Sequence, residues 1–135
     1  MQDEELLAKF DDCSLPLTSF RHEEHVRVAY LYLRKYPLLQ VLEKFPANLQ
    51  KFATAHGKTS LYHQTISWAY LFLIHQRLVA DLDVSGGCTW AQFKRRNRDL
   101  LDRSNPILQK YYAEETLASS VAREHFLMPD HPALG

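Results

Sequence analysis

The chain has 135 residues, of which 46% are hydrophobic and 24% charged, so it is long enough to fold as one ordinary globular domain without disulfide or metal staples. Its sixteen basic and sixteen acidic residues cancel, which excludes a net field that would draw it toward nucleic acid or an anionic membrane. We therefore expect a single domain over residues 1–135, with neither nucleic acid nor membrane as a partner, and leave the oligomeric state open.

The cysteines and the start of the chain bear on the cellular compartment. Cys13 and Cys88 are the only two cysteines, lie far apart and form no C-x-x-C spacing, which predicts reduced thiols in a reducing compartment. The acidic start contains no apolar segment of the secretory type. The most apolar stretch, residues 66–74, is too short to cross a bilayer. These features predict a cytoplasmic protein.

Helix signals account for most of the sequence, and no stretch alternates as a strand would. The first predicted helix covers about residues 3–12 and carries apolar side chains on one side. Thr18 or Ser19 is predicted to cap the second helix. That helix should run to about Tyr36, where Pro37 stops it.

The middle of the chain is predicted to form two longer helices. One covers residues 38–56, with an interruption near Pro46 and with Gly57 as its C-terminal cap. The next covers about residues 61–81 and is capped by the Thr-Ser pair before it. Apolar residues lie almost all round this helix, so we expect it to be the buried central element.

The last third begins with a predicted loop at residues 85–87. Thr89 with Gln92 matches a capping box for a helix that runs to Arg103. An Asn-Pro pair should then start a last helix over residues 106–127, with a kink.

These elements predict an all-α fold, namely a single-domain bundle of five to six helices with mostly antiparallel neighbours. The tail should be irregular from about residue 128. The basic run at residues 94–98 lies among acidic residues, and we interpret it as a solvated helix face rather than a phosphate-binding surface.

Three histidines are predicted to point inward at one end of the bundle. On a helix, His22 and His25 share a face with apolar residues, and His63 lies on the inward stripe of its own helix. Short connections make helices that are two apart run the same way. All three imidazoles should therefore converge, with Tyr62 and Tyr112 near them.

The leading hypothesis is a transition-metal site. Burial and the positive end of a helix both favour neutral imidazole, which is the form that binds metal. His22, His25 and His63 can offer three nitrogens to one divalent Zn, Fe, Cu or Ni ion and leave positions open for a substrate. Cys13 is either a further soft ligand or a buried thiol. The protein would then be a metal-binding protein or a metal-dependent enzyme acting on a small molecule.

Two alternatives remain open. The first is a metal-free polar pocket that binds a small molecule, in which His63 or His22 exchanges protons with the candidate catalytic residues Tyr62 or Tyr112. The second is a non-catalytic binding or interaction module whose histidines are structural. A di-iron carboxylate site, an H-E-x-x-H protease and a serine hydrolase are disfavoured because their motifs are absent.

The tail carries one further expectation. Arg123 and Asp130 are close in sequence and of opposite charge. We expect them to form an ion pair that fixes the tail, with closure of a pocket as the alternative.

Several short motifs resemble those of a family of small bacterial helical proteins with no established activity. They are Cys13-Ser14-Leu15-Pro16, Phe20-Arg21-His22-Glu23-Glu24-His25, Tyr62-His63-Gln64-Thr65, Tyr111-Tyr112 and Pro129-Asp130. The resemblance covers about residues 10–130 and implies that the important positions are His22, His25, Tyr62, His63, Thr65, Tyr112 and Asp130. The family has glutamate and serine where this chain has Gln64 and Ala113, so a carboxylate role at the first position is in doubt.

Overall fold

The computed structural model describes residues 1–85 and 88–134, in which the chain forms seven α-helices, five short 3-10 helices and no strand. This confirms the all-α fold class. The α-helices are α1 (Asp3–Asp11), α2 (His22–Lys35), α3 (Leu38–Ala55), α4 (Gln64–Ser85), α5 (Trp90–Arg96), α6 (Glu114–Ala118) and α7 (Ser120–Glu124). Of the loop predicted at residues 85–87, Gly86 and Gly87 lie outside the described residues, and Ser85 ends α4.

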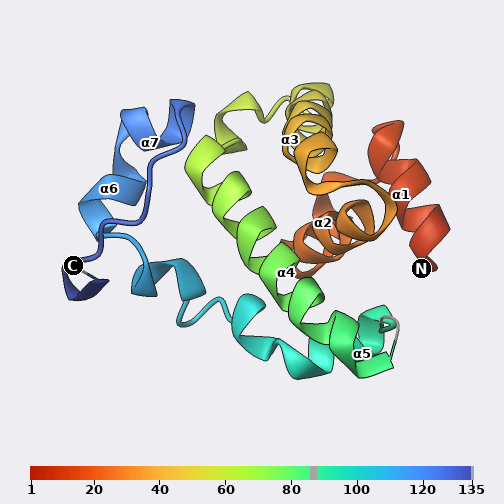
Figure 1. Cartoon of the computed structure of the whole chain (residues 1–135). Helices are drawn as coiled ribbons and strands as arrows, with labels where there is room; N and C mark the ends of the chain where they lie inside the picture. Colours follow the sequence, from red (N-terminus) through yellow and green to blue (C-terminus); the bar gives the residue numbers. More distant parts are fainter. Residues whose placement is uncertain (86–87, 135) are drawn as a thin grey trace.

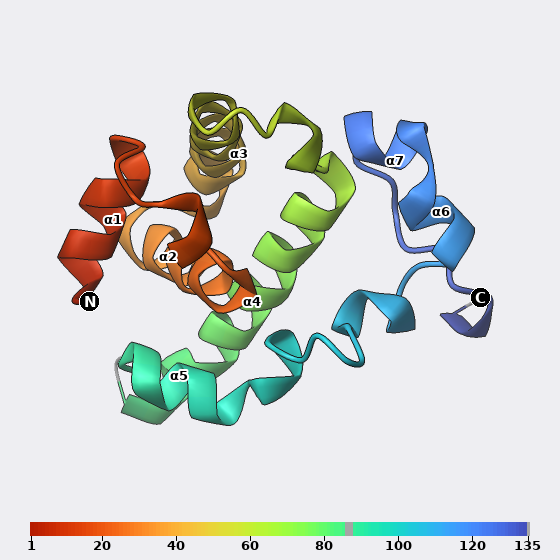
Figure 2. The same cartoon turned by 180° about the vertical axis from the view of Figure 1, so that it is seen from behind.

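Helix α4 is the central element, as its apolar composition predicts. In Figures 1 and 2 it runs between α1, α2 and α3 on one side and α6 and α7 on the other, and it contacts α2, α3 and α7. Its Leu71 and Ile74 side chains are fully buried. A helix covered on two sides needs apolar residues on both, which explains why no single apolar face stands out.

An aromatic cluster joins α1, α2 and α3. The ring of Phe10 lies 5.2 Å from that of Phe20, 6.0 Å from that of Phe45 and 5.4 Å from that of Phe52, measured between centroids. Phe20 belongs to the segment between α1 and α2, so this segment is packed into the core rather than left on the surface. The cluster fixes the position of the beginning of α2.

Helix α3 passes through Pro46 without the predicted interruption. A proline has no N–H and leaves the carbonyl four residues earlier, that of Leu42, without its helical donor. Here the indole Nε1 of Trp68 in α4 donates to that carbonyl at 3.1 Å. The proline is tolerated because a tertiary hydrogen bond replaces the missing helical one.

Helices α2 and α4 begin later than predicted, because a 3-10 turn precedes each of them. Residues Leu17–Ser19 and Thr59–Leu61 form these turns, and the predicted caps in them cap no α-helix. Helix α2 begins instead at His22, where the Glu24 carboxylate accepts a hydrogen bond from the backbone N–H of Arg21 at 3.1 Å.

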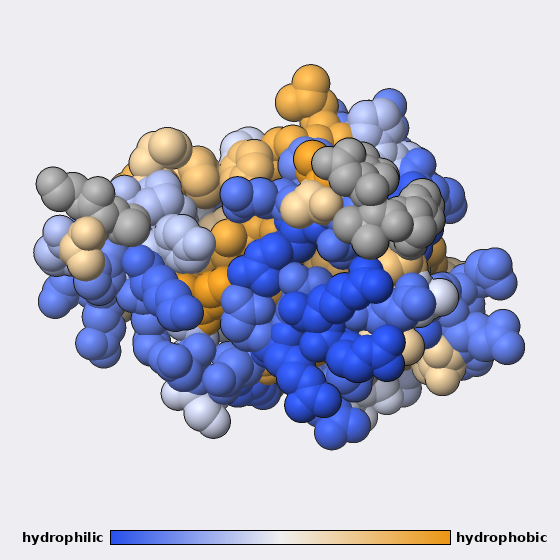
Figure 3. All heavy atoms as spheres, turned by 60° about the horizontal axis from the view of Figure 1, so that its bottom comes forward, coloured by the Kyte–Doolittle hydropathy of each residue, from blue (hydrophilic) through white to orange (hydrophobic). Residues whose placement is uncertain are grey.

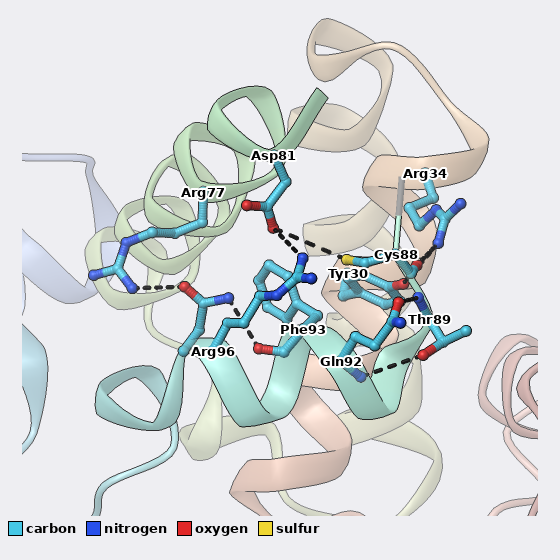
Figure 4. Close-up of polar contacts among 10 residues, drawn as sticks. Tyr30, Arg34, Arg77, Asp81, Cys88, Thr89, Gln92, Phe93 and Arg96 are labelled. Carbon is cyan, nitrogen blue, oxygen red and sulfur yellow. Dashed lines mark hydrogen bonds and ion pairs between the residues drawn. The ribbon is translucent and has the colours of Figure 1, made fainter. Parts of the chain in front are cut away.

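Helix α5 starts at the predicted capping box and ends earlier than predicted. Thr89 and Gln92 exchange backbone-to-side-chain hydrogen bonds of 3.0 and 3.2 Å (Figure 4). Just before the box, the Cys88 carbonyl accepts hydrogen bonds from Tyr30 and Arg34 of α2, which anchors α5 on that helix (Figure 4). The Asn97 amide then donates to the Phe93 carbonyl at 2.9 Å and ends the helix.

The predicted last helix is instead a chain of short pieces. Residues 98–134 contain α6, α7 and three 3-10 helices. Ser119 separates α6 from α7, because its backbone is extended and its hydroxyl caps α7 by accepting from the Ala122 N–H at 3.1 Å. From here on residues 98–134 are called the C-terminal segment.

The basic run at residues 94–98 lies on a hydrophilic face. Figure 3 shows strongly hydrophilic residues gathered on the face that is at the bottom of Figure 1, where α5 lies. Lys94 pairs with Glu23 at 2.9 Å and Arg96 with Asp81 at 3.9 Å. These ion pairs fit the interpretation as a solvated face.

Candidate functional site

His63 stands immediately before α4 and caps it. Its Nδ1 accepts a hydrogen bond from the backbone N–H of Ile66 at 3.1 Å, which is the contact that a capping side chain makes with the third residue of a helix. Its Nε2 lies 2.8 Å from the Leu117 carbonyl oxygen and carries the proton, because a carbonyl can only accept. Both ring nitrogens of the buried His63 are thus engaged, and a metal ion could bind only by displacing one partner.

His22, the first residue of α2, makes a similar long-range contact. Its Nε2 donates to the carbonyl oxygen of Leu100 at 2.9 Å. The ring also meets that of Tyr70 edge-on, with 5.3 Å between centroids. His22 therefore fastens the beginning of the C-terminal segment to α2 and α4.

Two other predicted positions fasten the end of the same segment. The buried Thr65 hydroxyl donates to the His125 carbonyl at 2.6 Å and accepts from the Leu127 N–H at 3.1 Å. The Tyr112 hydroxyl donates to the Leu127 carbonyl at 2.8 Å. An extended stretch without helical hydrogen bonds must find other partners for its backbone, and these two side chains supply them.

The predicted ion pair between Arg123 and Asp130 is wrong. Arg123 instead donates to the carbonyls of Ser60 and Tyr62 at 2.6 and 3.0 Å. The Asp130 carboxylate accepts from the Ala113 N–H at 3.0 Å and from the Thr116 hydroxyl. Each side chain finds unpaired backbone or hydroxyl groups nearby, and for Asp130 these contacts lower the pKa of the carboxyl group.

The two candidate catalytic tyrosines are hydrogen-bond donors. Burial raises the pKa of Tyr62, whose hydroxyl donates to the Gln64 side chain. Burial, with the negative charge of Asp130, raises the pKa of Tyr112 to about 12. Both hydroxyls therefore stay protonated at neutral pH, which suits donors and not proton acceptors.

His25 differs from the other two predicted ligands. Its ring stacks on Phe20 at 5.4 Å between centroids and lies 5.5 Å from Phe45. Burial, and secondarily the nearby His22, lower the pKa of His25 to about 4, so the imidazole is neutral at neutral pH. Among the described residues the ring makes no hydrogen bond, and its nitrogens are not cut off from solvent, because the one buried side-chain nitrogen or oxygen without a partner there is Nε2 of His56.

A cavity of about 280 Å³ opens beside His25, between α2, α3 and the beginning of α4. Its polar lining residues are His25, Tyr62, His63 and Ser67, and none of its lining residues is an acid, a lysine or an arginine. The remaining lining residues are Leu17, Phe20, Leu49, Phe52, Ala53, Leu61 and Ile66. The cavity is thus an apolar and aromatic space with a few hydrogen-bonding groups, which is typical of small-molecule sites.

The three histidines do not share this space. His25 and His63 line it, whereas His22 lines a separate cavity of about 350 Å³. In the part of the chain that the structure describes, no group of three or more His, Cys, Asp or Glu side chains is arranged to hold a metal ion. Cys13 is half-buried against the core and does not line the cavity. Metal ligation by His22, His25 and His63 stays a prediction.

Sequence reasoning missed two features of the cavity. Ser67 is four residues after His63, so the helical period that placed His63 inward would have found it. A cap at Thr18 or Ser19 would place Phe20 at the start of the second helix, whereas its contact with His25 depends on the 3-10 turn before it. A third cavity, of about 330 Å³ between α4 and the C-terminal segment, has an almost wholly apolar lining and offers little to orient a ligand.

Comparison of the chain with models of protein families, with curated protein sequences and with solved structures found no match. None of the helices within residues 1–85 and 88–134 has the length and apolar character needed to span a membrane.

Proposed function

We propose that the protein is a small-molecule-binding protein that needs no metal ion, and that its ligand occupies the cavity beside His25. The observation that carries this proposal is the neutral His25 imidazole, which faces the cavity without a hydrogen-bond partner among the described residues.

The different hydrogen bonding of the three histidines supports this proposal. His22 and His63 bond to backbone groups and so have a structural role. His25 is half-buried, and its ring nitrogens are reached by solvent through the cavity. A ligand that hydrogen-bonds His25 takes the place of water there, and the apolar lining adds the burial of its hydrophobic surface.

The chemistry of the cavity favours binding over catalysis. A general base works best with a pKa near the operating pH, whereas the pKa of His25 is lowered to about 4. Tyr62 stays protonated, and both nitrogens of His63 are engaged. No lining residue is left as an acid or base suited to neutral pH.

A cavity-filling variant tests the proposal. Ala53 lines the cavity and Ala47 is an exposed residue of the same helix, so Ala53→Leu and Ala47→Leu form a matched pair. We would titrate naphthalene, 2-naphthol, 2-naphthoate and 2-naphthylmethylammonium into the wild type and both variants. Amide chemical shifts would report the binding and its position.

At least one compound is expected to bind saturably and to shift signals of the cavity residues. Ala53→Leu should abolish this binding because the added carbon atoms occupy the space, and Ala47→Leu should bind like the wild type. The spectrum of each variant without ligand shows whether it is folded. The proposal fails if none of the four compounds binds, or if the two folded variants bind them equally well.

A further inference from the structure

The lining of the cavity beside His25 also defines the chemistry of its ligand. We infer that this ligand is a neutral, roughly two-ring aromatic molecule with one hydroxyl group, which donates a hydrogen bond to His25. This inference rests on the proposed function and adds the ligand class to it.

The volume of the cavity limits the size of the ligand. An apolar protein cavity of about 150 Å³ holds benzene. The cavity here measures about 280 Å³, which leaves room for a molecule of about two fused rings by the same comparison. Leu61 is 62% exposed at the rim and belongs to the 3-10 turn before α4, so the ligand would enter beside this turn.

The aromatic lining sets the shape. Phe20 and Phe52 meet at 4.9 Å between centroids with their planes tilted by 53°, and both line the cavity together with Tyr62. The His25 ring stacks on Phe20. Flat rings can meet these faces and edges in offset or edge-on contacts, which contribute beyond the burial of surface.

The absence of charge in the lining sets the ligand's charge. None of the lining residues is an acid, a lysine or an arginine, and His25 is neutral. A carboxylate, phosphate or ammonium group would lose its hydration without gaining an ion pair. The site should therefore reject charged analogues of the same shape.

The hydrogen-bonding groups of the lining determine which polar group the ligand should carry. A neutral imidazole has one accepting nitrogen, and in His25 no partner from the described chain occupies it. His63 cannot serve, because its nitrogens bond to Ile66 and Leu117. One ligand hydroxyl can donate to the accepting nitrogen of His25, and its oxygen can still accept a further hydrogen bond.

The four naphthalene compounds test this inference at pH 7, where 2-naphthol is neutral and 2-naphthoate is charged. Wild type should bind 2-naphthol about fivefold more tightly than naphthalene, the ratio expected for one hydrogen bond. It should bind the charged compounds roughly a hundredfold more weakly, because their charge stays unpaired. In His25→Phe the difference between 2-naphthol and naphthalene should vanish while naphthalene still binds.

A direct readout keeps the test independent of the variant's folding. In wild type labelled with ¹⁵N in the histidine rings, 2-naphthol should shift the signal of the accepting His25 nitrogen, and naphthalene should not. Equal affinity for 2-naphthol and naphthalene, or tighter binding of a charged compound in the cavity, would overturn the inference and leave the proposed function standing. Failure of all four compounds to bind would overturn both.

Discussion

Acidification should destabilise the protein through His25. The pKa of its imidazole is lowered from 6.5 to about 4, first by burial and then by His22. Between these two values the unfolded chain binds a proton that the folded chain does not, so the free energy of unfolding falls as the pH falls. Each pH unit in this interval costs about 1.4 kcal/mol, which amounts to about 3 kcal/mol over the whole interval. Above pH 6.5 the contribution of His25 is constant.

Urea unfolding at several pH values between 7 and 4 would measure this contribution. His25→Phe keeps the contacts with Phe20 and Phe45 but cannot take up a proton. All other titratable groups are shared, so the difference between wild type and variant isolates His25. Exposed His125 provides the control, and His125→Gln should follow the wild type. The reasoning would be refuted if wild type and His25→Phe lost stability in parallel as the pH falls.

Three further outcomes are expected. Thr65→Val removes two hydrogen bonds to the C-terminal segment, so it should lower the free energy of unfolding by about 1–3 kcal/mol. It should also speed hydrogen exchange of the Leu127 amide, and unchanged exchange would contradict this role of Thr65. Trp68→Phe should lower the free energy of unfolding by about 1–3 kcal/mol, because the Leu42 carbonyl loses its donor. The loss should be smaller in a Pro46→Ala background, where the new backbone N–H can donate to that carbonyl. Equal losses in the two backgrounds of a double-mutant cycle would argue against this account. Protein purified without a tag and exposed to Zn, Fe, Cu and Ni should keep far less than one metal ion per chain by elemental analysis, and a stoichiometric metal that is lost in His25→Phe would instead establish the metal site.

The features that could be predicted from the sequence are those that local signals determine. Gly57 has a φ of +69° just after α3, as its place at the predicted C-terminal cap requires. The Thr89 and Gln92 capping box forms as predicted. Helix α1 ends within one residue of the prediction, and α4 is the central helix. In each case the residues that cause the structure are near one another in the sequence.

The C-terminal segment could not be predicted because its backbone partners are distant in the sequence. The pattern of residues 106–127 predicts a helix, because it contains no sign of other partners for their backbone groups. The partners are His63, which is 54 residues from Leu117, and Thr65, which is 60 from His125. Tertiary hydrogen bonds of this kind override local propensity, and no local pattern reveals them.

The roles of the histidines were equally beyond prediction from the sequence. An inward imidazole at the start of a helix is what a metal ligand needs, and equally what a helix cap or a long-range backbone contact needs. The sequence establishes the position and not the partner, so it could not separate these roles for His22 and His63. The hydrogen bonds separate them, because a ring nitrogen that already has a partner has less to offer a ligand. Of the three predicted ligands, His25 alone makes no such bond among the described residues and lines a cavity, so it is the one on which ligand binding should depend.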